Sequence, residues 1–477
     1  MIFNSIEFGI FFPLVFILYY LFFNKRTKLR NVYFIVISYL FYGWWDWRFL
    51  SLIILSSFVD YILGQKIFEE KNEKKRKYLL IFSLSLNLGL LGFFKYFNFF
   101  VGSLIDAFSL FGQPLNISTL SIILPVGISF YTFQTLSYTL DIYYRRLKPT
   151  KNIFAFFAFV SFFPQLVAGP IERAKDLLPQ FLTKRPINYE LLRSGLFLMA
   201  WGFFKKIVIA DRLAIFVDGA YGDIESIDGI TAVCAIIFFA FQLYLDFSAY
   251  SDIAIGSSRM LGFKLSTNFR RPYLAKSFSD FWKRWHISLS SWFKDYVYIP
   301  LGGNRVNKSK HVKNILIVFI LSGLWHGASW NFVIWGSVNG LFILLLDYLL
   351  ISNKNNLIKR IFCSFFISTL WAISLVFFRS QDFSIAISMF KKIGTESQGV
   401  LYNFGLNSLE FLFSLKLLIG YIIFEIIQEK FAKIHDWFNS LNFLFRWTIY
   451  TSLIGGIIFF GSYGVGLNDN NFIYFQF

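Results

Sequence analysis

Apolar residues recur along this chain in runs that are long enough to cross a bilayer as helices. A spanning helix needs about 20 residues, because the hydrocarbon core is about 30 Å thick and a helix rises about 1.5 Å per residue. The pattern predicts an all-α polytopic membrane protein, with one integral-membrane domain over residues 1–477. The predicted spans lie near residues 6–23, 31–45, 49–64, 78–94, 118–142, 152–168, 190–210, 229–250, 312–346, 357–378, 408–427 and 444–463.

The composition excludes a soluble protein. Of the 477 residues, 56% are hydrophobic and 16% are charged, whereas soluble domains carry about 25% charged residues. The formal net charge of +18 would favour nucleic-acid binding in a soluble protein. Here the basic residues lie mostly in short connections between apolar runs, as the positive-inside bias of membrane insertion predicts. We therefore expect contact with membrane lipids and no nucleic-acid partner.

Two segments depart from the pattern of successive spans. Residues 163–186 contain four prolines after an apolar run, and broken backbone at membrane depth must be covered by protein or line a wet cavity. An ordinary surface loop is the alternative for its charged half. Residues 264–305 place aromatic and apolar residues at spacings of three and four. That spacing predicts an amphipathic helix on the cytoplasmic side of the interface, or simply a membrane-surface anchor.

The four histidines are His286, His311, His326 and His435. His326 lies 11 residues past the start of the apolar run 315–346, roughly 16–17 Å into the core if the run is helical. An ionisable side chain near the midplane is a candidate functional residue, and a hydrogen-bonded structural histidine is the alternative. His286 falls on the predicted amphipathic helix, where a histidine is unremarkable, and His311 and His435 are predicted to be surface residues.

The residues around His326 predict a break in this run. A straight helix of its 32 residues would be about 48 Å long, which exceeds the core thickness. Gly323 and Gly327 permit another backbone to approach closely. Ser322, His326 and Trp330 would share one helical face. We expect the helix to break at this small polar cluster.

The sequence lacks the motifs that are typical of several common enzyme and metal-binding classes. The sequence contains no G-x-S-x-G, P-loop, H-E-x-x-H or G-x-G-x-x-G motif. The two cysteines, Cys234 and Cys363, lie inside apolar runs and have no metal-type spacing. We expect neither a metal nor a bound cofactor. The acidic residues in or near spans could serve a proton path, cap helices or form ion pairs; they are Asp60, Asp141, Asp246 and Asp252.

Five longer motifs resemble the membrane-bound O-acyltransferases, in the bacterial branch that contains the membrane subunits of alginate and peptidoglycan O-acetylation systems. They are PVGISFYTFQTLSYTLD at 125–141, FFPQLVAGPIERAKDLLPQ at 162–180, QLYLDFSAYSDIAIGSSRMLGF at 242–263, FWKRWHISLSSWFKDYVYIPLGGNR at 281–305 and LSGLWHGASWNFVIWG at 321–336. The closing FIYFQF resembles the same branch.

The resemblance implies about eleven membrane-spanning helices, with re-entrant or interfacial helices, in a ring around a thin central region crossed by a tunnel. It implies a multi-pass protein of the bacterial inner membrane with acetyl-CoA as cytoplasmic donor. The acetyl group would pass to a separate periplasmic O-acetyltransferase partner that modifies a polysaccharide. His326 would be the catalytic histidine and His286 the second motif histidine.

The expected substrate-binding residues fall into two groups. Coenzyme A is polyanionic, so nearby cations would hold its phosphates, and polar or aromatic residues of the His326 motif would line the site. The cations are Arg270, Arg271, Lys283 and Arg284, and the motif residues are Ser322, Trp325, Trp330 and Asn331. Two other functions stay open: a transporter that exports an acylated sugar or lipid, and a non-catalytic scaffold for a periplasmic transferase.

The basic connections predict the topology. They follow the first, third and fifth predicted spans, at 25–30, 71–77 and 145–151. Alternate connections are therefore expected in the cytoplasm, with the N-terminus outside. Single cysteines placed in a cysteine-free variant should react with an impermeant thiol reagent at the N-terminus and not at 71–77. Labelling of the 71–77 connection in intact cells would contradict this topology.

Overall fold

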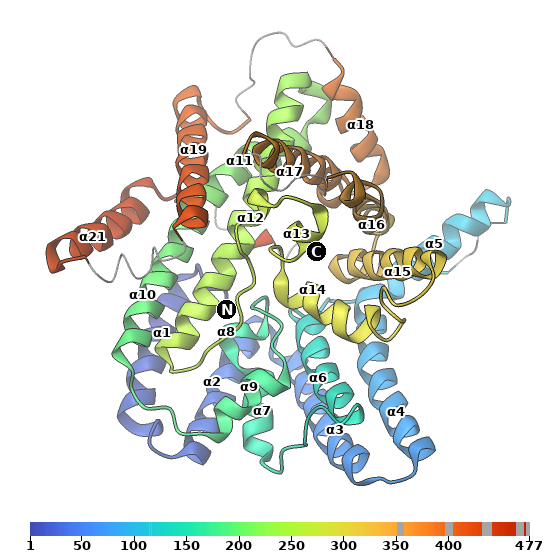
Figure 1. Ribbon diagram of the computed structural model, residues 1–477, viewed down its shortest axis with the longest axis vertical. Helices are drawn as coiled ribbons and strands as arrows, with labels where there is room; N and C mark the ends of the chain where they lie inside the picture. The colour runs from blue at the N-terminus through green and yellow to red at the C-terminus, as the bar shows by residue number, and fades with distance from the viewer. Residues whose placement is uncertain are drawn as a thin grey trace. The chain divides into compact units, whose positions relative to one another are not determined.

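The chain is helical and divides into two compact units (Figure 1). The computed structural model describes residues 1–113, 115, 117–350, 357–395, 404–431, 441–463 and 472–473. These residues form helices and no strand, which confirms the all-α prediction. The first unit comprises Met1–Leu196 and Ala254–Ser266, and the second comprises Phe197–Ile253 and Thr267–Phe477. His435 and residues 474–477 of the FIYFQF motif lie outside the described residues.

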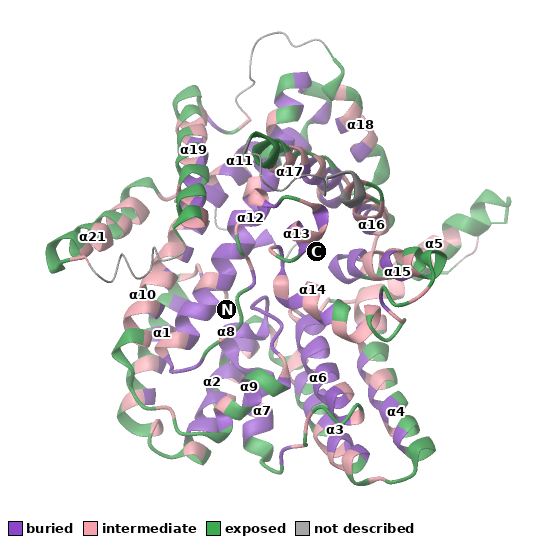
Figure 2. Ribbon diagram, in the orientation of Figure 1, coloured by how far each residue is buried: buried purple, intermediate pink, exposed green. Residues whose placement is uncertain are grey.

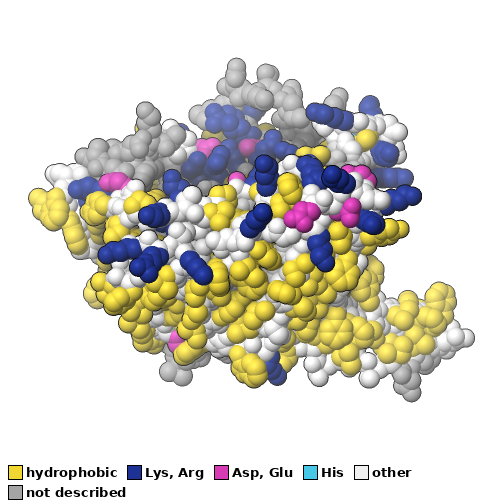
Figure 3. Space-filling model, turned by 90° about the horizontal axis from the view of Figure 1, so that it is seen from below, with side chains coloured by type: hydrophobic (Ala, Val, Ile, Leu, Met, Phe, Trp, Pro, Cys, Tyr) yellow, Lys and Arg dark blue, Asp and Glu magenta, His cyan; other side chains and the backbone are white. Residues whose placement is uncertain are grey.

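Long apolar helices confirm that this is a multi-pass membrane protein. Among the described residues, six helical stretches are long and apolar enough to cross a membrane. On the face seen in Figure 3, hydrophobic side chains form a broad band, and Lys and Arg side chains gather along one edge of it. The stretches are Ile6–Phe23, Thr27–Glu69, Glu73–Leu110, Gly229–Met260, Ile358–Arg379 and Phe443–Phe460, and Trp330–Leu346 is a shorter apolar helix.

The first unit packs its helices around α6 and α7, which are buried over most of their length (Figure 2). Hydrogen bonds from Gln65 to the Thr150 carbonyl and from Arg145 to the Phe68 carbonyl place the C-terminal end of α3 beside the connection after α6. Its helices are α1 (Ile6–Leu18), α2 (Thr27–Asp46), α3 (Leu50–Glu69), α4 (Glu73–Leu91), α5 (Phe97–Leu110), α6 (Ile128–Tyr143), α7 (Ile153–Ser161), α8 (Phe163–Leu166) and α9 (Ala174–Leu182), with the π-turns η1 (Tyr19–Phe23) and η3 (Gly92–Tyr96).

The proline-rich segment 163–186 is a broken hairpin whose first half is buried. The chain leaves α7, forms the single turn of α8, and returns through α9. The Gln165 side-chain amide donates to Gln134 of α6 at 2.9 Å, and the backbone amide of Phe163 donates to Ser38 of α2 at 3.0 Å. Gly127 has a positive φ of 75° and lies where a Cβ would stand 3.0 Å from the Leu166 carbonyl oxygen. Protein therefore covers the backbone of residues 163–172, as broken helices in membranes require. The charged half, residues 173–186, has many exposed residues, as expected of a surface loop.

A buried polar network joins α3, α4 and α6. Asp60 accepts hydrogen bonds from the Ser83 hydroxyl at 2.6 Å and from the Asn87 amide at 2.9 Å. The Ser56 hydroxyl donates to Asn87 at 2.7 Å. Polar side chains that face each other in this way hold membrane helices together, because lipid offers them no partner. Asp60 therefore has a structural role in this bundle.

In the second unit, a hairpin of two helices carries His326. Helix α15 ends at His326, and α16 begins at Trp330 after a three-residue turn. A Cβ on Gly323 would stand 2.1 Å from the Phe332 carbonyl oxygen, and one on Gly336 would stand 2.2 Å from that of Phe319. Only glycines permit this approach, so the predicted break at the small-residue cluster is confirmed.

Of the remaining helices of the second unit, α13 and α17 pack against α16, and η7 packs against α15. Helices α10 (Tyr189–Phe203) and α12 (Gly229–Met260) have residues in both units. The others are η4 (Phe204–Ala210), α11 (Asp211–Gly222), α13 (Phe278–Trp282), α14 (Ile287–Phe293), η7 (Lys294–Tyr298), α15 (Lys308–His326), α16 (Trp330–Leu350), α17 (Leu357–Arg379), α18 (Phe383–Ile393), α19 (Ser408–Lys430) and α21 (Phe443–Phe460).

The predicted elements differ from the structure at several places. Residues 118–142 are not one span, because the helix begins only at Ile128, after the positive-φ Gly127. Residues 264–305 do not form one amphipathic helix, since α13 and α14 are separated by residues 283–286. The short helices α5, α11 and α18 were not expected, because each is too short to show as a separate apolar run.

The close helix contact generates a stability prediction. Gly323→Ala should lower the free energy of unfolding by about 1–3 kcal/mol, because its Cβ would meet backbone that cannot rotate away. Gly420→Ala, in α19 with nothing within 4 Å of the added Cβ, is the matched control and should be neutral or stabilising by up to about 1 kcal/mol. Unfolding in mixed detergent micelles measures both. Equal effects would contradict the close α15–α16 contact.

Candidate functional site

Two buried histidines face each other in the second unit. The ring centroids of His286 and His326 are 6.3 Å apart. His286 is 0% exposed and His326 is 6% exposed. The Trp325 ring lies 5.7 Å from the His286 ring and 5.1 Å from the His326 ring. The structure thus brings together the two histidines that the sequence singles out, although they are 40 positions apart.

A backbone turn places His286 in the interior instead of on a surface helix. His286 has left-handed dihedrals of φ 42° and ψ 54° at the start of α14. This turn lets the aromatic residues of both short helices point inward, and Phe281, Trp285 and Leu289 are each 3% exposed or less. The prediction of rings lying at headgroup level is therefore wrong: they pack against protein.

Asn268 determines the tautomer of His286. The Asn268 Oδ1 atom accepts hydrogen bonds from the Ser288 amide at 3.2 Å and the Ser288 hydroxyl at 2.9 Å. His286 Nδ1 lies 3.1 Å from the same oxygen. An amide oxygen can only accept, so Nδ1 carries the proton and Nε2 is the acceptor nitrogen of the neutral ring. Burial lowers the pKa of His286, which lies outside the spanning helices, to about 3.

Aromatic rings enclose His326. Its ring lies 5.2 Å from that of Trp335 on α16 and 5.4 Å from that of Phe378 on α17, both measured between centroids. The space that they leave beside His326 is about 10 Å³. We call the side chains around this space the aromatic cage; besides His326 they are Leu243, Phe247, Trp285, Trp335, Trp371 and Phe378.

A second, much larger cavity of about 900 Å³ is lined in part by Trp282. Its lining includes Ser322, which stands one helical turn before His326 on α15. Aromatic and aliphatic side chains make most of its wall, and four basic side chains, Lys283, Lys294, Lys308 and His311, border it. Apolar walls with a few charged groups are typical of a ligand-binding cavity.

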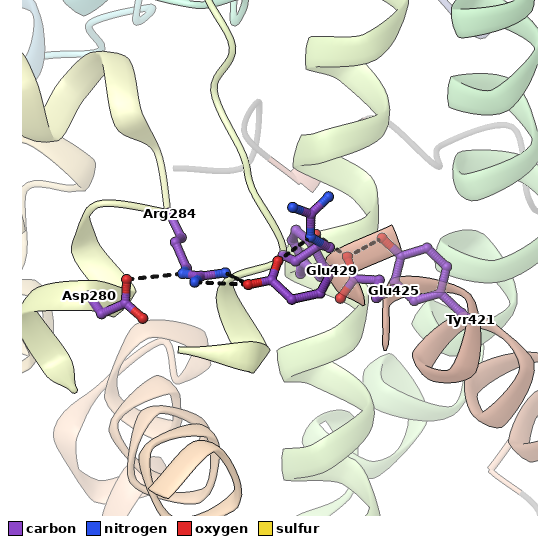
Figure 4. Close-up of polar contacts among 7 residues, drawn as sticks. Asp280, Arg284, Tyr421, Glu425 and Glu429 are labelled. Carbon is purple, nitrogen blue, oxygen red and sulfur yellow. Dashed lines mark hydrogen bonds and ion pairs between the residues drawn. The ribbon is translucent and has the colours of Figure 1, made fainter. Parts of the chain in front are cut away.

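A network of ion pairs holds the segment that carries His286 (Figure 4). Arg284 donates to Asp280 at 3.0 Å and to Glu429 at 3.1 Å. Arg271 donates to the other oxygen of Glu429 at 2.6 Å. Glu425, one turn earlier on α19, accepts from Tyr421 at 3.0 Å. These contacts join the connections around α13 to α19 and so fix the backbone beside the candidate site.

The other predicted substrate-binding residues lie in different places. Lys283 and Ser322 line the large cavity, and the Trp325 ring packs against both histidine rings. Trp330 begins a separate helix and is 59% exposed, so the prediction that it shares a face with His326 is wrong. The Asn331 amide donates to the Ser380 carbonyl at 2.9 Å, and Arg270 is exposed.

Sequence reasoning missed Asn268, Trp371 and Phe378. None carries a titratable group. Asn268 lies 18 positions before His286, and Trp371 and Phe378 lie in a different helix, α17, so no local signal identifies their contacts with the site. The intramembrane acids Asp246 and Asp252 pair with Lys206 at 2.6 Å and Lys205 at 2.8 Å. In the described part of the chain, no three His, Cys, Asp or Glu side chains are grouped so that they could hold a metal ion.

Known proteins resemble this chain over most of its length. A family model described as membrane-bound O-acyltransferase matches residues 144–375, which include both histidines. A probable alginate O-acetylase AlgI of Pseudomonas putida is 37% identical over 85% of this chain and 81% of its own length. The corresponding Azotobacter vinelandii protein is 36% identical over 91% and 86%. A peptidoglycan O-acetyltransferase of Helicobacter pylori is 37% identical over 69% and 67%.

The Asn268 contact generates a spectroscopic prediction. With ¹⁵N-labelled histidine, the His286 resonance should show the Nδ1-protonated neutral tautomer and stay unchanged between pH 5 and 8, because burial holds its pKa near 3. His286→Gln assigns the resonance. Asn268→Ala should produce a mixture of tautomers, since it removes the acceptor. A titration midpoint between pH 5 and 8 in the unaltered protein would contradict this environment.

Proposed function

Since this chain belongs to the membrane-bound O-acyltransferase family, we propose that it takes acetyl from cytoplasmic acetyl-CoA for O-acetylation of a cell-envelope polysaccharide. The observation that carries the proposal is the position of His326. It lies buried at a helix end, beside the neutral His286 and one turn from a large cavity with basic residues at its border. A buried base beside a cavity for an anionic thioester is what acyl transfer requires.

The large cavity supports coenzyme A as the carrier of the acyl group. At about 900 Å³ it is within the range of cofactor sites. Lys283, Lys294 and Lys308 would hold phosphates, while the apolar wall would hold the pantetheine arm. The carboxylate partners of Arg271 and Arg284 neutralise those two side chains. We therefore assign donor binding chiefly to the lysines of the cavity.

In the proposed reaction, His326 is the general base. It takes the proton of an acceptor hydroxyl as that oxygen forms a bond to the thioester carbonyl carbon. The carbon–sulfur bond then breaks, and the His326 imidazolium returns the proton to the leaving thiolate of coenzyme A. A histidine suits both steps because its unperturbed pKa of about 6.5 lies near neutral pH. His286, held by Asn268, would position the reacting groups.

The destination of the acetyl group is proposed from the relatives. Their names specify alginate and peptidoglycan as the acetylated polymers. Both polymers lie outside the cytoplasm, whereas acetyl-CoA is a cytoplasmic donor. We therefore place this chain in the bacterial inner membrane, where it would pass acetyl to a periplasmic O-acetyltransferase partner. Thioester cleavage distinguishes this activity from export of an acylated sugar or lipid and from a non-catalytic scaffold.

The role of His326 is directly testable. His326→Ala should lower acetyl transfer by about 10²- to 10⁴-fold, the usual effect of losing a general base. His286→Ala should cause a smaller loss if His286 only positions the reactants. Radiolabel from acetyl-CoA in the envelope polysaccharide and coenzyme A release by the purified protein provide the two measurements, at equal amounts of protein in the membrane.

Leu321→Ala is the control, because it shortens a 40% exposed side chain on the same helix α15 and should leave transfer unchanged. Near-normal activity of His326→Ala would refute the general-base assignment. Absence of thioester cleavage in the unaltered protein would refute acyl transfer and favour the transporter or the scaffold.

A further inference from the structure

The large cavity and the space beside His326 differ greatly in size. The large cavity has a volume of about 900 Å³, and the space in the aromatic cage is about 10 Å³. The latter is roughly the room that one water molecule needs. Trp282 lines the large cavity, and its ring lies 6.0 Å from that of Trp335 and 5.6 Å from that of Trp371, two of the side chains that line the small space.

The walls of the small space are tightly packed rings. The Phe378 ring lies 5.1 Å from that of Trp335 and 4.9 Å from that of Phe332. Trp371 lies 5.8 Å from Trp335 and 4.9 Å from Trp285, again between centroids. Every ring of the cage other than that of His326 is 4% exposed or less. In a close-packed interior of this kind, an added methylene group forces side chains or backbone to shift, which costs free energy.

We propose that the aromatic cage restricts the acyl group to two carbons, with Phe378 as the residue that sets this limit. This inference rests on the proposed acyl transfer at His326. The methyl group of an acetyl thioester is about the size of the space beside His326, and each further methylene would press on the ring of Phe378 or Trp335. Phe378 contacts His326 directly, so its ring stands where a longer chain would extend.

The inference predicts a strong preference for acetyl. One methylene in a close-fitting apolar pocket changes kcat/KM by about 10- to 200-fold. We therefore expect kcat/KM to fall at least tenfold from acetyl-CoA to propionyl-CoA, and again to butyryl-CoA, in the unaltered protein. The large cavity would not contribute to this preference, because it holds the carrier and not the acyl chain.

Phe378→Ala tests the assignment. It should raise the ratio of butyryl-CoA to acetyl-CoA turnover at least tenfold, since it removes the ring from the wall. Phe377→Ala is the matched control: it removes the same atoms from the neighbouring residue of α17, whose ring packs against Phe383 and Phe390 outside the cage. The control should leave the ratio unchanged. Coenzyme A release by the purified protein with each acyl-CoA is the readout.

Phe378→Leu is a second variant, which keeps more of the packing if Phe378→Ala does not fold. It should raise the ratio of propionyl-CoA to acetyl-CoA turnover. An unchanged ratio in a folded Phe378 variant that still uses acetyl-CoA would overturn the inference and leave the proposed function standing, as would equal use of acetyl-CoA and butyryl-CoA by the unaltered protein. If the unaltered protein cleaves none of these thioesters, the proposed function itself fails.

Discussion

The close contact between α15 and α16 is the interaction on which the candidate site depends. Gly323 and Gly336 bring the two backbones together, and a side chain on either would overlap a carbonyl of the opposite helix. The contact allows the chain to turn back only three residues after His326, although the apolar run continues. His326 is therefore presented at a helix end, where neighbouring helices can enclose its ring, and not on the side of a continuous span.

The basic residues near the site have two separate physical roles. Arg271 and Arg284 share the carboxylate of Glu429 and so hold the connections around α13 against α19. Lys283 and Lys294 border the large cavity, where an anionic ligand would meet them. All four look alike in the sequence, because each is a cation in a polar connection. They differ only in the tertiary structure, where Glu429, about 150 positions further along the chain, pairs with the two arginines. The lysines are available to a ligand.

Much of the fold could be predicted from the local sequence pattern, whereas much of the candidate site could not. The spans near 6–23, 357–378 and 444–463 match helices closely, because an apolar run of that length has only the helix available in a membrane. The break at His326 was predictable from run length and glycine spacing. The break at His286 was not predictable. A stripe of aromatic residues indicates which face of a segment is apolar, but it does not indicate a turn held by Asn268, 18 positions earlier.

The sequence by itself determined that this protein crosses a membrane, that His326 lies in an interrupted helix, and that cations gather beside the second histidine. These are properties of composition and of spacing over one or two helical turns. The tertiary structure alone decided that His286 is buried and neutral, and that Trp335, Trp371 and Phe378 leave so little room beside His326. The reason is that such contacts join residues far apart in the chain, and their distances depend on how closely whole helices approach one another.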